Sequence, residues 1–320
     1  MTSADGGTEY GRGERIMSRA VLFHEPGGPE VLRAEDVEEP QAGPGQVRVR
    51  VRAAGVQPYD CAVRAGWTPP GVSGSLPRIP GNEFAGVIDQ VGPGVTDWAP
   101  GDEVLGFGQL GAYAELIVSP ADQVTRKPAT MPWEVAGGFT AGTQTAHIAL
   151  EVIAPREGEV LLVHGAAGSV GGAAVQLARA AGAVVIGTAR EANHAYLRAL
   201  GALPVAYGEG LVERIRELAP RRVDCVLDGA GGEAFDLSLG LVADRSRMLT
   251  LVEHERAAAA GVRTTPPARS AARLAGLAER YARGELAWHV RAVYPLDRAA
   301  DAQRDVESGH GRGKVVLRVG

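Results

Sequence analysis

Hydrophobic and polar positions alternate along the first part of the chain. Between Gln46 and Ala53, valine alternates with glutamine or arginine, and this period of two predicts a strand with one buried face. Short apolar runs bounded by glycine and proline predict further strands at residues 20–23, 85–91 and 112–118. Short strands with frequent turns indicate a β-rich N-terminal domain.

The pattern changes after about residue 128. A segment with helical periodicity is followed by alternating strands and helices, which predicts a parallel sheet covered by helices. The predicted helices are 133–152, 169–181, 192–200 and 211–218, and the predicted strands are 159–163, 183–187, 204–206, 223–227 and 247–252. The last part breaks this alternation, and we expect a strand over 288–294, a helix that begins at Pro295, and a closing strand over 313–319 that rejoins the first domain.

Composition excludes several classes of protein. The 320 residues include 33 Lys and Arg against 38 Asp and Glu, so the net charge is −5, and hydrophobic residues make up 45%. This balance predicts a folded chain of two domains, without a basic face for nucleic acid or an anionic membrane. No apolar run is long enough to span a membrane, and we expect residues 1–16 to form a flexible leader. Cys61 and Cys225 have no disulfide or metal spacing, which fits a cytoplasmic protein.

The segment 159–190 carries a glycine pattern in a strand–turn–helix context. A predicted strand runs into Gly165, and Ala166-x-Gly168-x-x-Gly171 then opens a helix, as a dinucleotide-binding fingerprint requires. Gly168 would let the backbone approach a pyrophosphate, Gly171 would let the helix pack on the strand, and the free amides of the helix start would hold the anion. Ala166 stands where the first glycine usually lies, and a plain tight turn is the alternative interpretation.

The end of the second strand of this unit indicates which nucleotide would bind. It reads Thr188-Ala189-Arg190, and an arginine here accommodates a 2′-phosphate, whereas a carboxylate would bind the ribose hydroxyls of NAD. Arg190 therefore favours NADPH, with Thr188 as a further donor to the phosphate. Glu191 is the alternative acid, although a glutamate at a helix start is also explained by the helix dipole.

Several motifs together resemble one family. These are AAGVQPYDCAVRAG, PGNEFAGVIDQVGPGV, GAYAE, HGAAGSVG, LRALGA and the terminal GRGKVVLRV. From Arg19 to Val319 the chain resembles the zinc-free, NADPH-dependent quinone oxidoreductase branch of the medium-chain dehydrogenase/reductase superfamily. The resemblance implies an α/β protein with a GroES-like, β-rich catalytic domain over 17–130 and 284–320. It also implies a Rossmann domain, with a doubly wound parallel sheet that binds NADPH, over 131–283.

The resemblance also implies positions around the cofactor. Thr145 would lie near the nicotinamide amide, and Ala230 and Leu251 would line the nicotinamide, although both could equally be core residues. Arg190 and Tyr207 would surround the 2′-phosphate, although Tyr207 could simply be a half-buried aromatic at a strand end. The residues expected at the pyrophosphate are Gly165, Ala167, Gly168, Ser169, Val170 and Gly171.

The chain departs from related sequences at two places. The zinc-dependent relatives have cysteine and histidine at the positions of Gln57 and Asn82, and the seven histidines are scattered, so we predict no metal site. The branch itself usually has asparagine where Gln57 stands. Pro266-Pro267 occupy the place of an aromatic-rich edge strand, and prolines cannot donate hydrogen bonds to a sheet, which puts a homodimer and the usual substrate wall in doubt.

These features predict zinc-independent hydride transfer from NADPH to a small molecule, either a quinone or the C=C bond of an α,β-unsaturated carbonyl. Tyr59 is the candidate donor to the developing enolate oxygen, with Gln57 as a polar anchor. Asp60 is a candidate acid, but a helix N-cap and an ion pair with Arg64 would explain it equally. Two alternatives remain open: an enoyl-thioester reductase that works on a carrier protein in secondary metabolism, and an NADPH-binding protein with little turnover.

Overall fold

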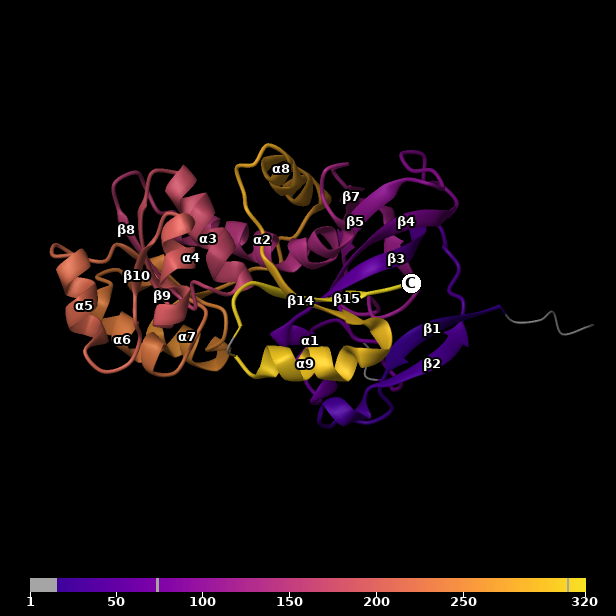
Figure 1. Cartoon of the computed structure of the whole chain (residues 1–320), viewed down its shortest axis with the longest axis horizontal. Coiled ribbons are helices and arrows are strands. Elements are labelled where there is room, and N and C mark those ends of the chain that lie inside the picture. Colours follow the sequence, from indigo (N-terminus) through magenta and orange to yellow (C-terminus); the bar gives the residue numbers. More distant parts are fainter. Residues whose placement is uncertain (1–15, 73–74, 310) are drawn as a thin grey trace, which may run out of the picture.

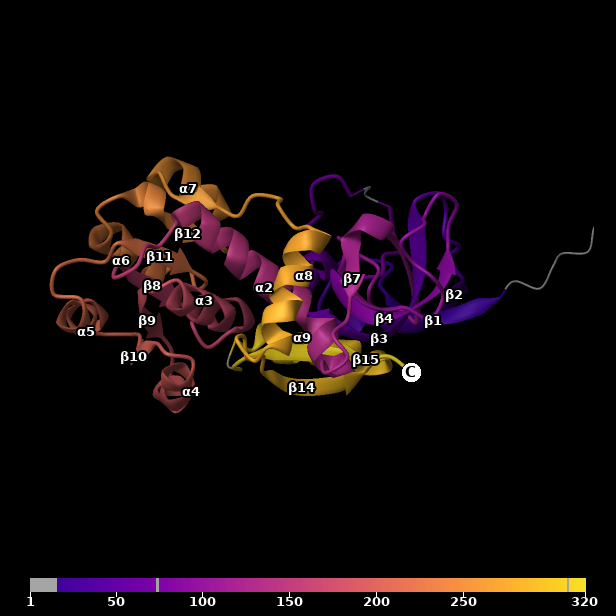
Figure 2. The ribbon, with the colours of Figure 1, turned by 90° about the horizontal axis from the view of Figure 1, so that it is seen from above.

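The computed structural model describes residues 16–72, 75–309 and 311–320, so the expected leader lies outside the described residues apart from Ile16. The two large sheets lie toward opposite ends of an elongated molecule, with helices between them (Figures 1 and 2). Within the described part of the chain, no helix is both long and apolar enough to cross a membrane.

The first sheet joins both parts of the chain that the resemblance assigns to one domain. Its strand order is β14-β15-β3-β4-β5-β7, with β6 paired to β3, and a separate antiparallel pair, β1-β2, lies beside it. Val315 pairs with Val56 in an antiparallel register, so the C-terminal segment extends the sheet formed by the N-terminal one. The bounds are β1 (Met17–Leu22), β2 (Arg33–Glu38), β3 (Gln46–Val56), β4 (Glu83–Val91), β5 (Glu103–Phe107), β6 (Leu116–Pro120), β7 (Val124–Arg126), β14 (Val290–Pro295) and β15 (Lys314–Arg318).

The second sheet is parallel throughout. Its strand order, β10-β9-β8-β11-β12-β13, runs outward from β8 in both directions, which is the doubly wound arrangement that places a ligand beyond the carboxyl ends of the central strands. The strands are β8 (Val160–His164), β9 (Val184–Thr188), β10 (Leu203–Val205), β11 (Cys225–Asp228), β12 (Met248–Thr250) and β13 (Arg263–Thr264). The helices after them are α3 (Ser169–Ala180), α4 (His194–Ala199), α5 (Leu211–Leu218), α6 (Glu233–Leu241) and α7 (His254–Ala260). The predicted α/β class, β-rich domain and doubly wound sheet are confirmed.

Helix α2 (Trp133–Ile153) connects the two sheets, with α8 (Ala271–Ala282) beside it (Figure 2). A Cβ on Gly137 would lie 2.5 Å from the Cβ of Ala53, so glycine lets this helix approach β3 closely. Phe139 is fully buried in a core that contains residues of both sheets, Leu105 and Leu161 among them. The two halves of the molecule are therefore packed through one continuous apolar core.

Several expected elements differ in the structure. The helix expected from Pro295 begins later, as α9 (Ala299–Glu307), because Pro295 completes β14 and a 3-10 turn over Leu296–Arg298 follows. The strand expected over 112–118 begins only at Leu116. Strand β13 has two residues and ends before Pro266-Pro267, as expected for residues without a backbone N–H. Helices α6, α7 and α8 were not among the sequence-based expectations.

Candidate active site

A cavity of about 870 Å³ opens between the glycine turn after β8 and the start of α1 (Pro58–Arg64). Its size suits a ligand as large as a dinucleotide fragment with a small second molecule. Predicted site residues from both halves of the molecule line it together: Gln57, Tyr59, Thr145, Gly165, Gly168, Ser169, Val170, Gly171 and Leu251. Of the other predicted residues, Asp60, Ala167, Thr188, Arg190, Tyr207 and Ala230 do not line it.

The glycine turn fits the pattern that its sequence predicts. Gly165 has φ +69°, and a Cβ on Gly171 would lie 2.4 Å from the Gly165 carbonyl oxygen, so glycine is needed at both positions. A Cβ on Gly168 would meet one protein atom within 4 Å, the Gly165 oxygen at 3.3 Å, so the space beside Gly168 is otherwise open. The first turn of α3 carries no acidic residue. Its amide groups can therefore bind an anion.

The residues predicted around the 2′-phosphate lie at the ends of β9 and β10. The Arg190 Nε donates a 2.7 Å hydrogen bond to the Tyr207 hydroxyl, and both side chains are exposed. Thr188 is instead 3% exposed, and its hydroxyl lies 3.1 Å from the His164 Nδ1. The structure thus brings Arg190 and Tyr207 together at the surface and turns the Thr188 side chain inward.

His164 is a lining residue that the sequence reasoning missed. Its Nε2 lies 2.9 Å from the Ser238 hydroxyl, which donates to the Ala234 carbonyl, so His164 Nε2 is the donor and Nδ1 accepts from Thr188. Burial lowers the pKa of His164 to about 4, and the ring is neutral at pH 7. The sequence could have identified His164 as a lining residue, because it directly precedes Gly165, the first residue of the glycine turn. The neutral ring joins β8, β9 and α6 beneath the glycine turn.

Asp60 lies behind the cavity and is not the N-cap residue of α1: Gln57 holds that position, and Asp60, three residues later, completes a capping box with it. Its Oδ2 accepts hydrogen bonds from the Gln57 backbone N–H at 2.9 Å and from the Tyr113 hydroxyl at 3.1 Å. The side chain is fully buried, and this burial raises its pKa to about 7. The expected ion pair with Arg64 is wrong: the Arg64 guanidinium instead donates to Gln303 and Glu307 of α9, because that helix covers α1.

A buried ion pair, also missed from the sequence, supports Gln57. The Lys314 Nζ lies 2.7 Å from the Glu83 Oε1, and the two side chains are 2% and 0% exposed. Lys314 also donates to the Val56 carbonyl, and the Ala141 backbone N–H donates to Glu83 Oε2. The Gln57 side-chain amide donates to the same carboxylate, which fixes its orientation beside the cavity.

Tyr59 presents a protonated phenol to the cavity. Its ring meets Trp67 edge to face, with centroids 5.2 Å apart, and its hydroxyl lies 3.5 Å from Gln109 Oε1. Burial raises the pKa of Tyr59 to about 12, and the Asp60 charge adds to the effect. The hydroxyl therefore keeps its proton at neutral pH and can donate a hydrogen bond to a ligand oxygen.

The remaining wall includes the segment after β13. Thr265, Pro266, Pro267 and Arg269 line the cavity there, and Asn82 is also part of its lining. The side-chain oxygens of Thr265 and Asn82 are buried without a hydrogen-bond partner, so they remain available to a bound molecule. Across the described ranges of the chain, no three His, Cys, Asp or Glu side chains are grouped so that they could hold a metal.

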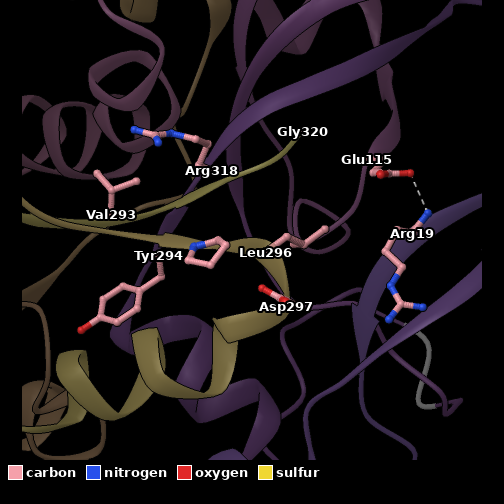
Figure 3. A pocket seen from close by; sticks show the side chains of 9 residues that line it. Arg19, Glu115, Val293, Tyr294, Leu296, Asp297, Arg318 and Gly320 are labelled. Atoms are coloured by element: carbon pink, nitrogen blue, oxygen red, sulfur yellow. Dashed lines mark hydrogen bonds between the residues drawn. The ribbon is translucent and has the colours of Figure 1, made fainter.

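A second hollow, of about 520 Å³, lies at the surface between β1 and β14 (Figure 3). Its arginines are already paired: Arg19 with Asp36 at 3.3 Å, and Arg318 with Glu134 at 2.8 Å. Glu115 accepts from the Arg19 backbone N–H. This hollow offers a ligand no free arginine, and the larger cavity is the better candidate site.

Comparison with known proteins agrees with this geometry. Residues 43–129 match the family model of the alcohol dehydrogenase GroES-like domain, and residues 200–317 match that of the zinc-binding dehydrogenases. A quinone oxidoreductase of Pseudomonas aeruginosa is 35% identical over 241 residues, which cover 73% of each chain. A 2-haloacrylate reductase of Burkholderia sp. is 34% identical over 237 residues, covering 72% of this chain and 71% of the reductase.

The chain is also similar to part of a much larger protein. The erythronolide synthase EryA2 of Saccharopolyspora erythraea is 41% identical over 217 residues, which cover 66% of this chain. The match spans only 6% of the synthase, and the corresponding share is 8% or less in the two polyketide synthases that follow it in similarity.

Solved structures extend the likeness to almost the whole fold. The quinone oxidoreductase of Coxiella burnetii superposes with a TM-score of 0.85 at 27% identity, covering 95% of this chain and 100% of that one. A mycobacterial protein solved in complex with NADPH superposes with a TM-score of 0.82 at 33% identity, covering 94% and 99%.

Proposed function

Because the chain belongs to the quinone oxidoreductase branch of the medium-chain dehydrogenase/reductase superfamily, we propose that it reduces a quinone or the C=C bond of an α,β-unsaturated carbonyl with NADPH, without a metal. The observation that carries this proposal is the shared cavity. It places the glycine turn of β8-α3 beside Gln57 and Tyr59.

The residues present fit a nicotinamide dinucleotide. The open space at Gly168 and the amides of α3 would hold the pyrophosphate, and Thr145 and Leu251 would line the nicotinamide. Arg190 and Tyr207, already hydrogen-bonded to each other, would bind a 2′-phosphate, which favours NADPH over NADH. When bound, the cofactor supplies the hydride.

The chain's own residues would position the acceptor and stabilise its developing charge. The Tyr59 hydroxyl would donate a hydrogen bond to the oxygen that becomes negative, and Gln57, oriented by Glu83, would anchor the same end of the molecule. Asn82 and Gln57 occupy the positions where zinc-dependent relatives carry ligands, and neither amide is a usual zinc ligand. Asp60 acts as a positioning residue for Gln57, because it lies behind the cavity.

A second candidate function is reduction of an enoyl thioester held on a carrier protein. The likeness to polyketide synthases favours it. It uses the same cofactor site and the same hydride chemistry, and differs in the group that carries the double bond.

The test is NADPH oxidation by the purified protein after treatment with a chelator, with a quinone and a 2-alkenal as acceptors and NADH in parallel. We expect turnover that survives chelation and prefers NADPH. Arg190→Ala should reduce this preference by about tenfold or more, because it removes a charge-assisted contact to the 2′-phosphate.

Arg198→Ala is the matched control, since Arg198 is a nearby exposed arginine on α4. It should keep the cofactor preference of the wild type. If NADPH binds but no acceptor is reduced, including a carrier-bound enoyl thioester, the chain is an NADPH-binding protein with little turnover and the proposed reaction is wrong.

A further inference from the structure

One cation stands out in the cavity wall. Of the described side chains that line the cavity, Arg269 alone is charged at neutral pH, because the others are apolar, neutral polar, or the neutral His164. No aspartate or glutamate lines the cavity beside it. A ligand in the cavity therefore meets a single, positive charge.

No described residue accepts a hydrogen bond from the Arg269 guanidinium. Within the ranges that the structure describes, it makes no hydrogen bond and no ion pair, although Arg273, four residues later, pairs with Glu151 at 2.8 Å. Arg269 is partly buried, and burial lowers its pKa below the ordinary range. A guanidinium stays protonated in proteins, so it offers all its donors to whatever enters the cavity.

The nearest acids cannot neutralise this charge. Glu83 acts on Arg269 electrostatically, but its carboxylate already binds Lys314, Gln57 and the Ala141 amide. Asp60 completes the capping box of α1, and its raised pKa leaves part of its population neutral at pH 7. A partly buried, uncompensated arginine is unfavourable unless a bound anion completes it.

The neighbours of Arg269 indicate that the anionic group belongs to the acceptor and not to the cofactor. The titratable groups close enough to interact electrostatically with Arg269 are Glu83, Tyr59 and Asp60, all from the GroES-like side of the cavity. The Tyr59 hydroxyl, which faces the reacting oxygen in the proposed function, is one of them. The pyrophosphate would instead meet the amides of α3.

We propose that the physiological acceptor carries an oxyanion, which is either a carboxylate or a phosphate. Arg269 binds this oxyanion while Tyr59 contacts the reacting end of the same molecule. This inference rests on the proposed function and names the substrate class for it. The carboxylate would belong to a small unsaturated acid, and the phosphate to the phosphopantetheine arm of a carrier-bound thioester. In both cases the planar guanidinium can donate two parallel hydrogen bonds to the oxyanion.

Two matched pairs of acceptors test the proposal and separate the two sources. The first pair is 2-chloroacrylate and its methyl ester, and the second is a crotonyl thioester of phosphopantetheine and of N-acetylcysteamine. In each pair, one member carries the oxyanion and the other lacks it. We expect the protein to prefer the anionic member of at least one pair in kcat/KM, and that pair identifies the source of the anion.

Arg269→Gln should lower the ratio of kcat/KM between the anionic and the neutral member by about 10- to 100-fold, mainly through KM, because a charge-assisted hydrogen bond is lost. Arg269→Lys should recover part of the ratio. Arg283→Gln removes an exposed arginine and changes the net charge equally, and should keep the wild-type ratio. The affinity for NADPH, measured by titration, should change less than twofold in Arg269→Gln.

Three outcomes overturn the proposal. The first is that the protein prefers neither anionic acceptor, and the second is that its preference survives Arg269→Gln. The third is that Arg269→Gln weakens NADPH binding by the same factor by which it raises the KM of the anionic acceptor. A binding titration with 2-chloropropionate and its methyl ester needs no turnover. If the protein reduces neither pair, yet binds the free acid in an Arg269-dependent way, the anion site stands and the proposed reaction fails.

Discussion

The two walls of the cavity differ in whether main-chain or side-chain atoms form them. On the side proposed for the cofactor, backbone forms much of the surface, and Gly165, Gly168 and Gly171 matter because they lack side chains. On the acceptor side, side chains form the surface, and a buried pair from distant segments, Glu83 and Lys314, holds them. The first wall therefore depends on the space within one turn, and the second on charge pairing across the fold.

This difference predicts how each wall fails. A backbone wall is damaged by adding atoms, because a new Cβ must displace main-chain atoms that cannot move alone. A wall that is held by a buried ion pair is damaged by removing one partner of the pair, because the other is left desolvated and unpaired. The same distinction explains why Arg269, which has no partner among the described residues, can be replaced without leaving an orphaned carboxylate.

The largest effect is expected for Lys314→Met. The substitution leaves the fully buried Glu83 carboxylate without its cation, and we expect the free energy of unfolding to fall by about 3–5 kcal/mol. Urea unfolding measures it. The double variant Glu83→Gln/Lys314→Met should be more stable than the single one, because no buried charge remains unpaired. A single variant that loses less than about 1 kcal/mol would show that pairing does not hold this wall.

The next effect concerns the backbone wall, in Gly171→Ala. The added Cβ would lie 2.4 Å from the Gly165 oxygen and 2.6 Å from the Ala166 Cα, so the turn must shift. We expect a loss of about 1–3 kcal/mol in unfolding free energy and weaker NADPH binding. Gly276→Ala is the matched control at an exposed position of α8, where a Cβ meets nothing within 4 Å, and it should stabilise the protein by about 0.5–1 kcal/mol. Equal changes in unfolding free energy for the two variants would show that the lack of space for a Cβ at Gly171 does not limit stability.

The sequence predicts the backbone wall better than the side-chain wall, and the reason is locality. The run from β8 through α3 to β9 is contiguous, and its glycine spacing carries the constraints of the turn. The α/β class, the parallel sheet and the return of the C-terminal strand to the first sheet follow from similar local periodicities. Boundaries and the helices α6 to α8 were less predictable, because tertiary packing decides them.

The side-chain wall depends on partners far apart in the chain. Arg64 meets Gln303 and Glu307 on α9, so its spacing from Asp60 suggested an ion pair that the fold does not make. The Pro266-Pro267 departure did point to an unusual wall, but nothing local showed that Arg269 would face a cavity without an acid. The predicted roles of the cofactor and catalytic residues, and the proposed domain boundaries, stay predictions until the experiments above are made.

The last effect is a pH dependence of the side-chain wall, which is small at any one pH step. Burial raises the pKa of Asp60 to about 7, above its unfolded value near 3.8, so between these values the folded chain holds a proton that the unfolded chain has released. The stability that Asp60 contributes is complete below the unfolded pKa and is lost as pH rises through the folded one. Asp60→Asn cannot titrate but keeps an oxygen for the Gln57 N–H.

The difference in unfolding free energy, wild type minus Asp60→Asn, should therefore fall by on the order of 1 kcal/mol per pH unit between about pH 4 and 7. His164 has the opposite sign, since its lowered pKa of about 4 makes its contribution grow as pH rises toward its unfolded value, but both proteins share it. Urea unfolding across this range measures the difference, with the exposed Asp122→Asn as a control. Parallel curves for wild type and Asp60→Asn would mean that Asp60 stays ionised in the folded protein, and Arg269 would then face a compensating negative charge.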